Sequence, residues 1–182
     1  SAELTGFSFG TWPGIQLVFV NGKHSATLSS NPAETNGVFA GSLAEALEKQ
    51  ASRVQPHLAR YASVSGEPFA ALNTAFVSDG AFIYLPKGCV VEEPIHLLFL
   101  SCGEKTGPKV CHPRVLVLAE ANSQVRILES YASLGEGVCF TNAVTELVAE
   151  ENAFVDHYKL QRESLEAFHI STVQVQLGRS AN

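Results

Sequence analysis

An internal repeat with a spacing of thirty residues is the feature that most restricts how this chain can fold. The segment Val117–Val125 (VLAEANSQV) returns as Leu147–Val155 (LVAEENAFV), which aligns Asn122 with Asn152. A third asparagine, Asn182, follows after the same interval. Internal repeats of about 20 to 50 residues are typical of solenoids, in which each unit buries its apolar face only against its neighbours. The sequence therefore predicts a solenoid.

The repeated units are predicted to be β-strands, because their inward positions recur with a period of two. These positions hold Val115 and Val117, then Thr145 and Leu147, then Val175 and Leu177. A helical repeat would need a period near 3.6. Strands joined by segments too long for a hairpin stack in parallel. We expect a mainly β fold, a parallel β-helix in which residues 115, 145 and 175 lie in register.

The turns of the predicted β-helix carry residues that tolerate a left-handed backbone. Asn122 and Asn152 can adopt that conformation and hydrogen-bond along the stack, and Gly88 takes the same place in the first turn. One position breaks the pattern, because His157 stands where the preceding unit has Ile127. We expect a β-bulge to account for the mismatch and His157 to be a hydrogen-bonded core or edge histidine rather than a base.

The chain is predicted to have two parts, a hairpin and helical cap over residues 1–78 and the β-helix over residues 79–182. Strands of the β-helix are expected at residues 82–85, 95–100, 114–118, 124–131, 140–148, 154–161 and 170–177. In the first part, β runs at Ile15–Val20 and Ser25–Leu28 flank Asn21-Gly22, a strong hairpin signal.

Short helices are expected over residues 43–52, 56–61 and 69–76. The first follows a capping box formed by Ser42 and Glu45, and the others begin near Pro56 and Pro68. A solenoid leaves the edge of its first rung unpaired, so we expect these helices to cover that edge. No second cap follows, and we expect a β-helix that is truncated at residue 182 and continues in the natural protein.

Composition excludes some partners. The formal charge of −6 and the isoelectric point near 5.5 provide no basic surface for nucleic acid. No apolar run approaches the roughly 18 residues needed to cross a bilayer, so we expect a soluble, intracellular protein with no membrane partner. The four cysteines form no CxxC pair, and reduced thiols in a cytosolic setting are the simpler interpretation.

One loop gathers residues that could bind metal. Cys102, Cys111 and His112 follow a strand that contains His96. Structural zinc sites favour ligand pairs two to four residues apart, and these cysteines are nine apart. An ordinary polar loop is therefore favoured over a metal-binding module that uses the Cys102–His112 loop, although both stay open. Cys89 and Cys139, which adjoin β runs, are expected to fill the core.

A carbohydrate-active β-helix enzyme is a further alternative. Such enzymes use carboxylates on a sheet face as calcium ligands or as acid and base. This chain has only two aspartates, Asp79 and Asp156, and most of its glutamates fall at predicted turns. Nucleophilic triads and phosphate-binding glycine loops are absent from the sequence. We expect no enzyme activity and assign no catalytic, cofactor-binding or metal-binding residue.

Residues 69–88 (FAALNTAFVSDGAFIYLPKG) resemble the segment that leads into the β-helix of the SufB/SufD family, the scaffold subunits of the SUF iron-sulfur cluster assembly system. The continuation VVEEPIHLLF over residues 90–99 and the upstream hairpin IQLVFVNGK are similar to the SufD branch. The likeness covers about residues 15–182. It implies a right-handed parallel β-helix flanked by helical regions, and a non-catalytic scaffold.

The resemblance also implies partners. SufD pairs with SufB and binds the SufC ATPase, and this SufBCD complex builds a nascent iron-sulfur cluster. The cluster belongs to the full complex, so no cofactor is expected on this fragment, and no cluster role is carried to Cys89, Cys102, Cys111 or Cys139. The compartment implied is the bacterial cytosol, or the plastid stroma of a plant or alga. The open end of the truncated β-helix predicts self-association.

Overall fold

The computed structural model describes residues 12, 14–30, 37–103 and 107–182. Two β-sheets face each other, one with strand order β10-β8-β5-β1-β2 and the other with order β11-β9-β7-β4-β3. The first sheet contains β1 (Gln16–Val20), β2 (Lys23–His24), β5 (Ile95–Cys102), β8 (Gln124–Leu134) and β10 (Phe154–Arg162). The second contains β3 (Phe39–Ser42), β4 (Gly80–Leu85), β7 (Arg114–Ala119), β9 (Cys139–Ala149) and β11 (Ala167–Leu177), and β6 (Lys109–Cys111) pairs with β9.

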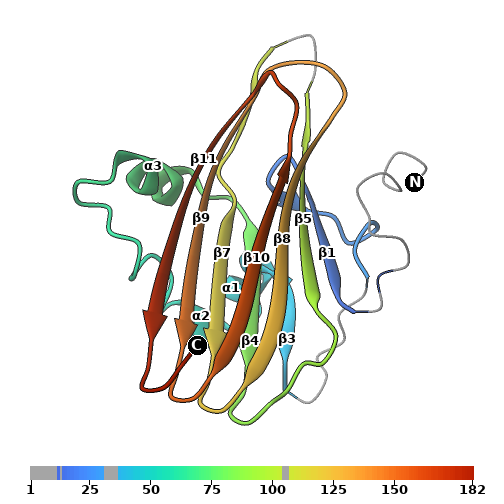
Figure 1. Cartoon of the computed structure of the whole chain (residues 1–182). Coiled ribbons are helices and arrows are strands. Elements are labelled where there is room, and N and C mark those ends of the chain that lie inside the picture. Colours follow the sequence, from blue (N-terminus) through green and yellow to red (C-terminus); the bar gives the residue numbers. More distant parts are fainter. Residues whose placement is uncertain (1–11, 13, 31–36, 104–106) are drawn as a thin grey trace.

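From β4 onward the chain alternates between the two sheets, so that each coil adds one strand to each sheet. Within each sheet these strands pair in parallel with the strands of neighbouring coils. The result is a parallel β-solenoid of about three turns, which confirms the predicted mainly β fold. Figure 1 shows the strands as long arrows side by side, with the connecting turns gathered at the two ends.

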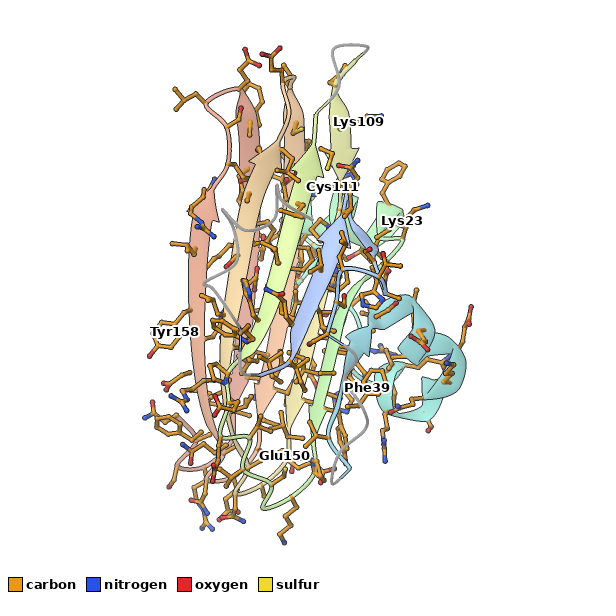
Figure 2. The ribbon with its side chains drawn as sticks, turned by 90° about the vertical axis from the view of Figure 1, so that its right-hand side faces the viewer. Lys23, Phe39, Lys109, Cys111, Glu150 and Tyr158 are labelled. Carbon is orange, nitrogen blue, oxygen red and sulfur yellow. The ribbon has the colours of Figure 1, made fainter. Side chains whose placement is uncertain are left out.

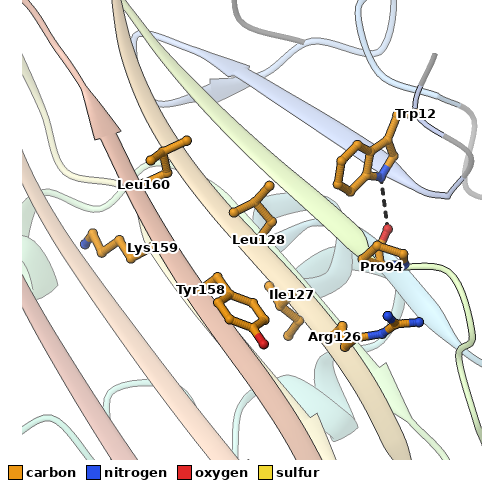
Figure 3. Close-up of a pocket in the computed structure, with 8 residues that line it drawn as sticks. All are labelled: Trp12, Pro94, Arg126, Ile127, Leu128, Tyr158, Lys159 and Leu160. Carbon is orange, nitrogen blue, oxygen red and sulfur yellow. Dashed lines mark hydrogen bonds between the residues drawn. The ribbon is translucent and has the colours of Figure 1, made fainter. Parts of the chain in front are cut away.

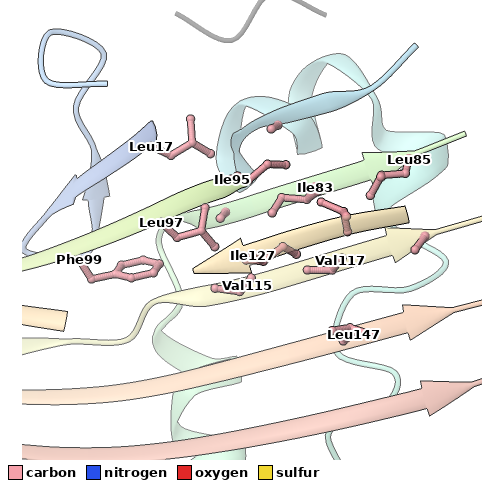
Figure 4. Close-up of a cluster of buried hydrophobic side chains, with 14 of the residues drawn as sticks. Leu17, Ile83, Leu85, Ile95, Leu97, Phe99, Val115, Val117, Ile127 and Leu147 are labelled. Atoms are coloured by element: carbon pink, nitrogen blue, oxygen red, sulfur yellow. The ribbon is translucent and has the colours of Figure 1, made fainter. Parts of the chain in front are cut away.

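The core lies between the two sheets and is built from alternate residues of each strand. Figure 4 shows its central part, with side chains from both sheets directed toward one another. Fully buried members include Leu17, Ile83, Leu97, Val117 and Ile127. Burying an aliphatic or aromatic side chain of this size contributes about 1.5 to 3 kcal/mol, so this interior holds the coils together.

The turns at one end stack residues with positive φ. Gly88 (φ 73°), Asn122 (φ 61°) and Asn152 (φ 57°) occupy equivalent places in successive turns, as the sequence predicts. The amide of Asn152 donates a hydrogen bond of 3.2 Å to the Asn122 side chain, which confirms the expected asparagine stack. In the last turn the positive φ belongs to Ser180 (57°) and not to Asn182, so that part of the repeat prediction is wrong.

The last coil is two residues shorter than the repeat predicts. Val115 pairs with Thr145 as expected, but Thr145 pairs with Val173, and Val175 pairs with Leu147. The expected alignment of residue 175 with residues 115 and 145 is therefore wrong. The difference arises in the turn between β10 and β11. Residues 132 and 139 are seven positions apart, whereas their partners in the last coil, residues 162 and 167, are only five apart.

The predicted β-bulge is also wrong. The pairing of β10 with β8 runs without interruption from Phe154 opposite Gln124 to Arg162 opposite Ala132. His157 therefore lies directly opposite Ile127 and faces the interior. A polar partner inside the solenoid, Glu129, makes this possible.

The first part of the chain closes the edge of the solenoid with strands. Positive φ at Asn21 (49°) and Gly22 (79°) makes the predicted hairpin turn, although its second strand is Lys23–His24 and not Ser25–Leu28. β1 then pairs in parallel with β5, and β3 pairs antiparallel with β4. The expectation that helices cover this edge is wrong, because β1 and β3 form the backbone hydrogen bonds that the edge strands β5 and β4 would otherwise lack.

The helices instead cover the outer face of the six-stranded sheet. They are α1 (Leu43–Lys49), α2 (Ala51–Val54) and α3 (Pro68–Phe76), and Figure 1 shows them on that side of the molecule. Leu43, Ala46 and Val54 pack against Phe82 and Leu116 of the sheet. The predicted Ser42 cap is confirmed, since its hydroxyl accepts a hydrogen bond of 3.1 Å from the Glu45 amide.

Three local predictions in this region differ from the structure. The single helix over 43–52 is divided into α1 and α2 at Gln50, whose φ of −136° is not helical. The helix predicted over 56–61 is a series of turns, in which Ala59 has a φ of 57°. The strands β3 and, farther along the chain, β6 lie where no strand was predicted. β3 and β6 both depend on pairing with strands distant in sequence, which local patterns do not reveal.

The exposed last strand generates a prediction about association. Val173, Val175 and Leu177 face the interior side of β11, yet they are 44%, 43% and 52% exposed. We expect the chain to self-associate through this apolar edge. The double substitution Val173→Lys and Val175→Lys should weaken association at least tenfold in sedimentation equilibrium, because it places charges on the edge.

Gln174→Lys is the matched control, since Gln174 lies between these residues and points to the opposite face. It should leave association within about twofold of the unchanged chain, because its charge lies away from the apolar row. A purely monomeric chain at high concentration would contradict the prediction.

Candidate functional site

The structure separates the three residues of the loop that was considered as an alternative metal-binding module. The thiol of Cys111 faces the interior, 3.6 Å from the Thr141 hydroxyl. His112 is on the outer face, where its ring stacks on Phe76 at a centroid distance of 5.7 Å. Cys102 follows the outward alternation of β5. Among the described residues no group of three or more His, Cys, Asp or Glu side chains is arranged to hold a metal ion.

His96 lies on the opposite side of the first sheet from Cys111 and is fully buried. Its ring nitrogens contact Gln16 and Ser130, each at 2.9 Å, and Trp12 packs on it at a centroid distance of 5.0 Å. Burial lowers the pKa of His96 to about 4, with a smaller contribution from the charge of Arg162. His96 is therefore a neutral, structurally bound histidine near pH 7.

All four cysteines are free. Cys139 is buried, as predicted, whereas Cys89 is only partly buried and lies in a turn, so the expectation that it fills the core is wrong. Burial raises the pKa of the Cys111 and Cys139 thiols. A raised pKa keeps these thiols protonated at neutral pH, which lowers their reactivity.

A polar cluster inside the last coils is the candidate functional site. Its centre is Glu129 on β8, which strand alternation places inside the solenoid and which is completely buried. Tyr131 donates to its carboxylate at 2.6 Å and Thr145 at 3.0 Å. From the last strand of the first sheet, His157 Nε2 lies 2.8 Å from Oε2 and Lys159 Nζ lies 3.4 Å from Oε1.

Glu129 is held in its charged form by this surrounding. Burial alone would raise its pKa, but the hydrogen bond from His157 and the charges of Lys159 and His157 outweigh that effect and lower the pKa to about 2. The same arrangement explains why the inward position of His157 is polar. The prediction that His157 is a hydrogen-bonded core or edge residue is thereby confirmed.

A second polar group continues the cluster toward the end of the solenoid where Cys111 lies (Figure 2). Thr141 donates to Glu163 at 3.1 Å, and Nδ1 of His169 lies 2.8 Å from Glu163 Oε2. The His169–Glu163 contact is close but is not aligned as a hydrogen bond. In the last coils the interior therefore changes along the strands from apolar at the turn of Asn122 to polar at the other end.

A buried ion pair fixes the helices to the outside of the solenoid. Arg114 on β7 and Glu146 on β9 are both fully buried and point outward. Arg114 Nη2 lies 2.8 Å from Glu146 Oε2, and Nε donates to the same oxygen at 3.1 Å. Arg114 also donates to Asn73 at 3.1 Å and to Thr74 at 2.9 Å, both on α3.

Glu146 in turn organises the turn that follows α2. Its carboxylate accepts hydrogen bonds from the backbone N–H groups of Ala59, Tyr61 and Ala62 at 2.8 to 2.9 Å. These bonds explain why residues 56–61 form a turn where a helix was predicted. Gly80 is required at the same place, because a Cβ there would lie 1.8 Å from the Arg114 carbonyl oxygen.

Sequence reasoning missed both polar clusters. The available signal was the period of two, which puts Glu129 on the inward side of β8 and Arg114 and Glu146 on the outward side of their strands.

The two aspartates weighed for a carbohydrate site are not brought together. Asp79 is bound to Ser42 and to the backbone N–H groups of His24 and Ala44, whereas Asp156 lies on β10.

Comparison with known proteins identifies the family. The SufBD protein N-terminal region matches residues 13–97, and the SufBD core domain of the SUF system for FeS cluster assembly matches residues 100–182. The chain belongs to the SufBD family. An iron-sulfur cluster assembly SufBD family protein of Synechocystis sp. is 34% identical over 177 residues, which cover 91% of this chain and 38% of that protein.

Two further relatives are similar over a smaller part of the chain. The chloroplastic protein ABCI7 of Arabidopsis thaliana is 32% identical over 80% of this chain and 31% of its own length. The iron-sulfur cluster assembly protein SufB of Bacillus subtilis is 27% identical over 76% of this chain and 30% of its own length. The chain thus spans about a third of these relatives. None of the helices in its described part is long and apolar enough to cross a membrane.

The Glu129 cluster generates a pH-dependent prediction. Because the pKa of Glu129 is lowered on folding, its charge stabilises the fold above the unfolded pKa near 4.5, and this stabilisation is lost as the pH falls toward about 2. Glu129→Gln should lower the free energy of unfolding at pH 7 by on the order of 3 kcal/mol. The difference from the unchanged chain should shrink steadily between about pH 5 and pH 2 in urea titrations.

Glu166→Gln is the control for this series, since Glu166 is exposed in the turn before β11. It should change the unfolding free energy by less than about 0.5 kcal/mol at either pH. A constant difference between the Glu129→Gln variant and the unchanged chain across the pH range would contradict the assigned charge state.

The buried ion pair generates a second prediction about stability. Glu146→Gln leaves the Arg114 guanidinium buried without a counter-charge, which should cost about 3 to 5 kcal/mol of unfolding free energy. Glu45→Gln breaks the exposed pair with Lys49 and should cost at most about 1 kcal/mol. Chemical unfolding followed by circular dichroism compares the two, and equal losses would show that burial does not determine the strength of the Arg114 pair.

Proposed function

We propose that this chain is part of a non-catalytic scaffold subunit in iron-sulfur cluster assembly. The observation that carries the proposal is the pair of SufBD matches, which together extend from residue 13 to residue 182 with only two residues between them. The β-solenoid supports it, since stacked strands provide a long, rigid surface for other proteins. The cluster is the cargo of the assembly and not a resident cofactor of this chain.

The partners proposed are a SufB-type paralogue and a SufC-type ATPase, in a complex of the SufBCD kind. The exposed inward residues of β11 support a role in which another protein surface, or further chain, covers this end of the solenoid. We assign the chain to the SufD type, on the likeness of its residues 90–99 and of its hairpin to that branch. Its relatives from a cyanobacterium and a chloroplast support the bacterial cytosol or the plastid stroma as its location.

A scaffold role is also supported by the state of the polar groups. Four side chains of the same chain contact Glu129, and these contacts connect neighbouring strands and hold them in register. The cysteines with raised pKa values are poor nucleophiles at neutral pH. These features favour the scaffold over the carbohydrate-active enzyme and over the metal-binding module at Cys102, Cys111 and His112.

Co-purification tests the proposal. The full-length gene is expressed with the SufB-type and SufC-type genes of the same organism, and only the SufC-type ATPase carries a tag. We expect all three proteins to elute together in size-exclusion chromatography at a constant ratio. A complex of the other two proteins that excludes this one would contradict the proposal.

Elemental analysis of this chain, purified without oxygen, distinguishes the metal-binding alternative from the proposed scaffold. Iron and zinc should each stay well below one equivalent per chain. Metal near one equivalent that disappears in the double variant Cys111→Ser and His112→Ala would instead favour the metal-binding module. Cys89→Ser, in a distant turn, is the matched control.

A further inference from the structure

A groove lies on the outer face of the five-stranded sheet, and none of its lining residues belongs to a helix. It has a volume of about 500 Å³ and lies over β8 and β10. The residues that line it are Trp12, Pro94, Arg126, Ile127, Leu128, Tyr158, Lys159 and Leu160. Strand alternation turns the side chains of Ile127 and Lys159 toward the interior. Figure 3 shows Trp12 and Tyr158 on either side of Leu128. This volume falls within the roughly 300 to 1,000 Å³ of small-molecule sites, which are mainly apolar and aromatic.

The Trp12 side of the groove is held in place by defined contacts. The indole N–H donates to the Pro94 carbonyl at 2.9 Å, and the ring packs on His96, which Gln16 and Ser130 fix in turn. Because its polar group is used in this way, Trp12 presents an apolar ring face. Preformed walls of this kind reduce the conformational entropy that the protein loses when a ligand binds.

The opposite side is an aromatic residue that the fold itself leaves exposed. Tyr158 is 58% exposed, and Figure 2 shows it projecting from the outside of the last strand of the first sheet. Within the described part of the chain its hydroxyl forms no hydrogen bond. The outward neighbours Leu128 and Leu160 provide an apolar floor where a solvated sheet face normally carries polar residues.

A positive charge lies at one end of the groove. Arg126 uses one guanidinium nitrogen to donate to the Glu92 carbonyl oxygen, and its other N–H groups have no acceptor among the described residues. Asp156 stands opposite Arg126 in the strand register, but it does not line the groove, and no ion pair joins the two in the described part of the structure. A guanidinium with free donors binds carboxylate-type anions in fork geometry.

We propose that this groove binds a small planar aromatic molecule that carries a negative charge. The ring lies between Trp12 and Tyr158 above Leu128 and Leu160, and the anionic group lies against Arg126. Aromatic pairs favour offset or edge contacts with such rings, and the cationic end selects the charge. This inference does not depend on the proposed scaffold function, because a ligand on the outer face leaves the interior and the edge of β11 free.

The test uses 2-naphthoate as the probe, with 2-naphthamide as its uncharged counterpart. Trp12 is the only tryptophan of the chain, so its fluorescence reports directly on the groove, and isothermal titration calorimetry gives the affinity. We expect saturable binding of 2-naphthoate with a change in Trp12 emission. Tyr158→Ala, or Leu160→Gln if that variant folds poorly, should weaken binding at least tenfold.

Charge selection is tested with Arg126→Gln. This variant should weaken 2-naphthoate about tenfold and change the affinity for 2-naphthamide less than twofold. The matched controls are Phe168→Ala, an exposed aromatic residue on the other sheet, and Arg179→Gln, an exposed arginine in the last turn. Both should bind 2-naphthoate like the unchanged chain.

Three results would count against the proposal. The first is the absence of saturable 2-naphthoate binding at millimolar concentration. The second is binding that Tyr158→Ala and Phe168→Ala weaken equally, since this places the probe elsewhere. An equal loss of both probes in Arg126→Gln would overturn the assignment of a negatively charged ligand.

Discussion

The in-register stacking of parallel strands is the constraint on which the rest of this molecule depends. Parallel neighbours cannot be joined by tight hairpins, so the chain crosses to the other sheet and returns one coil later. Each coil must therefore reach the same turn with the same side chains facing inward. Gly88, Asn122, Asn152 and Ser180 meet this requirement by turning the backbone through the left-handed region at equivalent points. Where the length of a coil changes, as before β11, the turn absorbs the difference and the pairing is kept.

Much of this stacking could be predicted from the sequence, because a solenoid repeats its local pattern. The spacing of Asn122 and Asn152 and the alternation around Val115 and Val117 were sufficient to give the fold class and most strands. The family resemblance at residues 69–88 pointed to the SufBD family, which the comparisons confirm. The distinction between SufD and SufB depends on less of the chain and stays a prediction.

The remaining features depend on contacts between residues far apart in sequence. The edge strands β1 and β3 are short, and their pairing with β5 and β4 is invisible to local patterns. The turn at residues 56–61 exists because Glu146, more than eighty positions later, binds its backbone. The polar interior was missed for the same reason, since His157 breaks the apolar repeat and its partner, Glu129, lies on a different strand twenty-eight positions earlier.

The change from an apolar to a polar interior has a consequence for what can extend this solenoid. Any strand laid along β10 would place its own inward side chains above His157 and Lys159, which are still partly open to solvent. A strand with leucines at those points would strip water from an imidazole and an ammonium group without replacing it. The backbone hydrogen bonds of a parallel pair form with almost any sequence. The desolvation penalty at His157 and Lys159 would therefore determine which strands can add to β10.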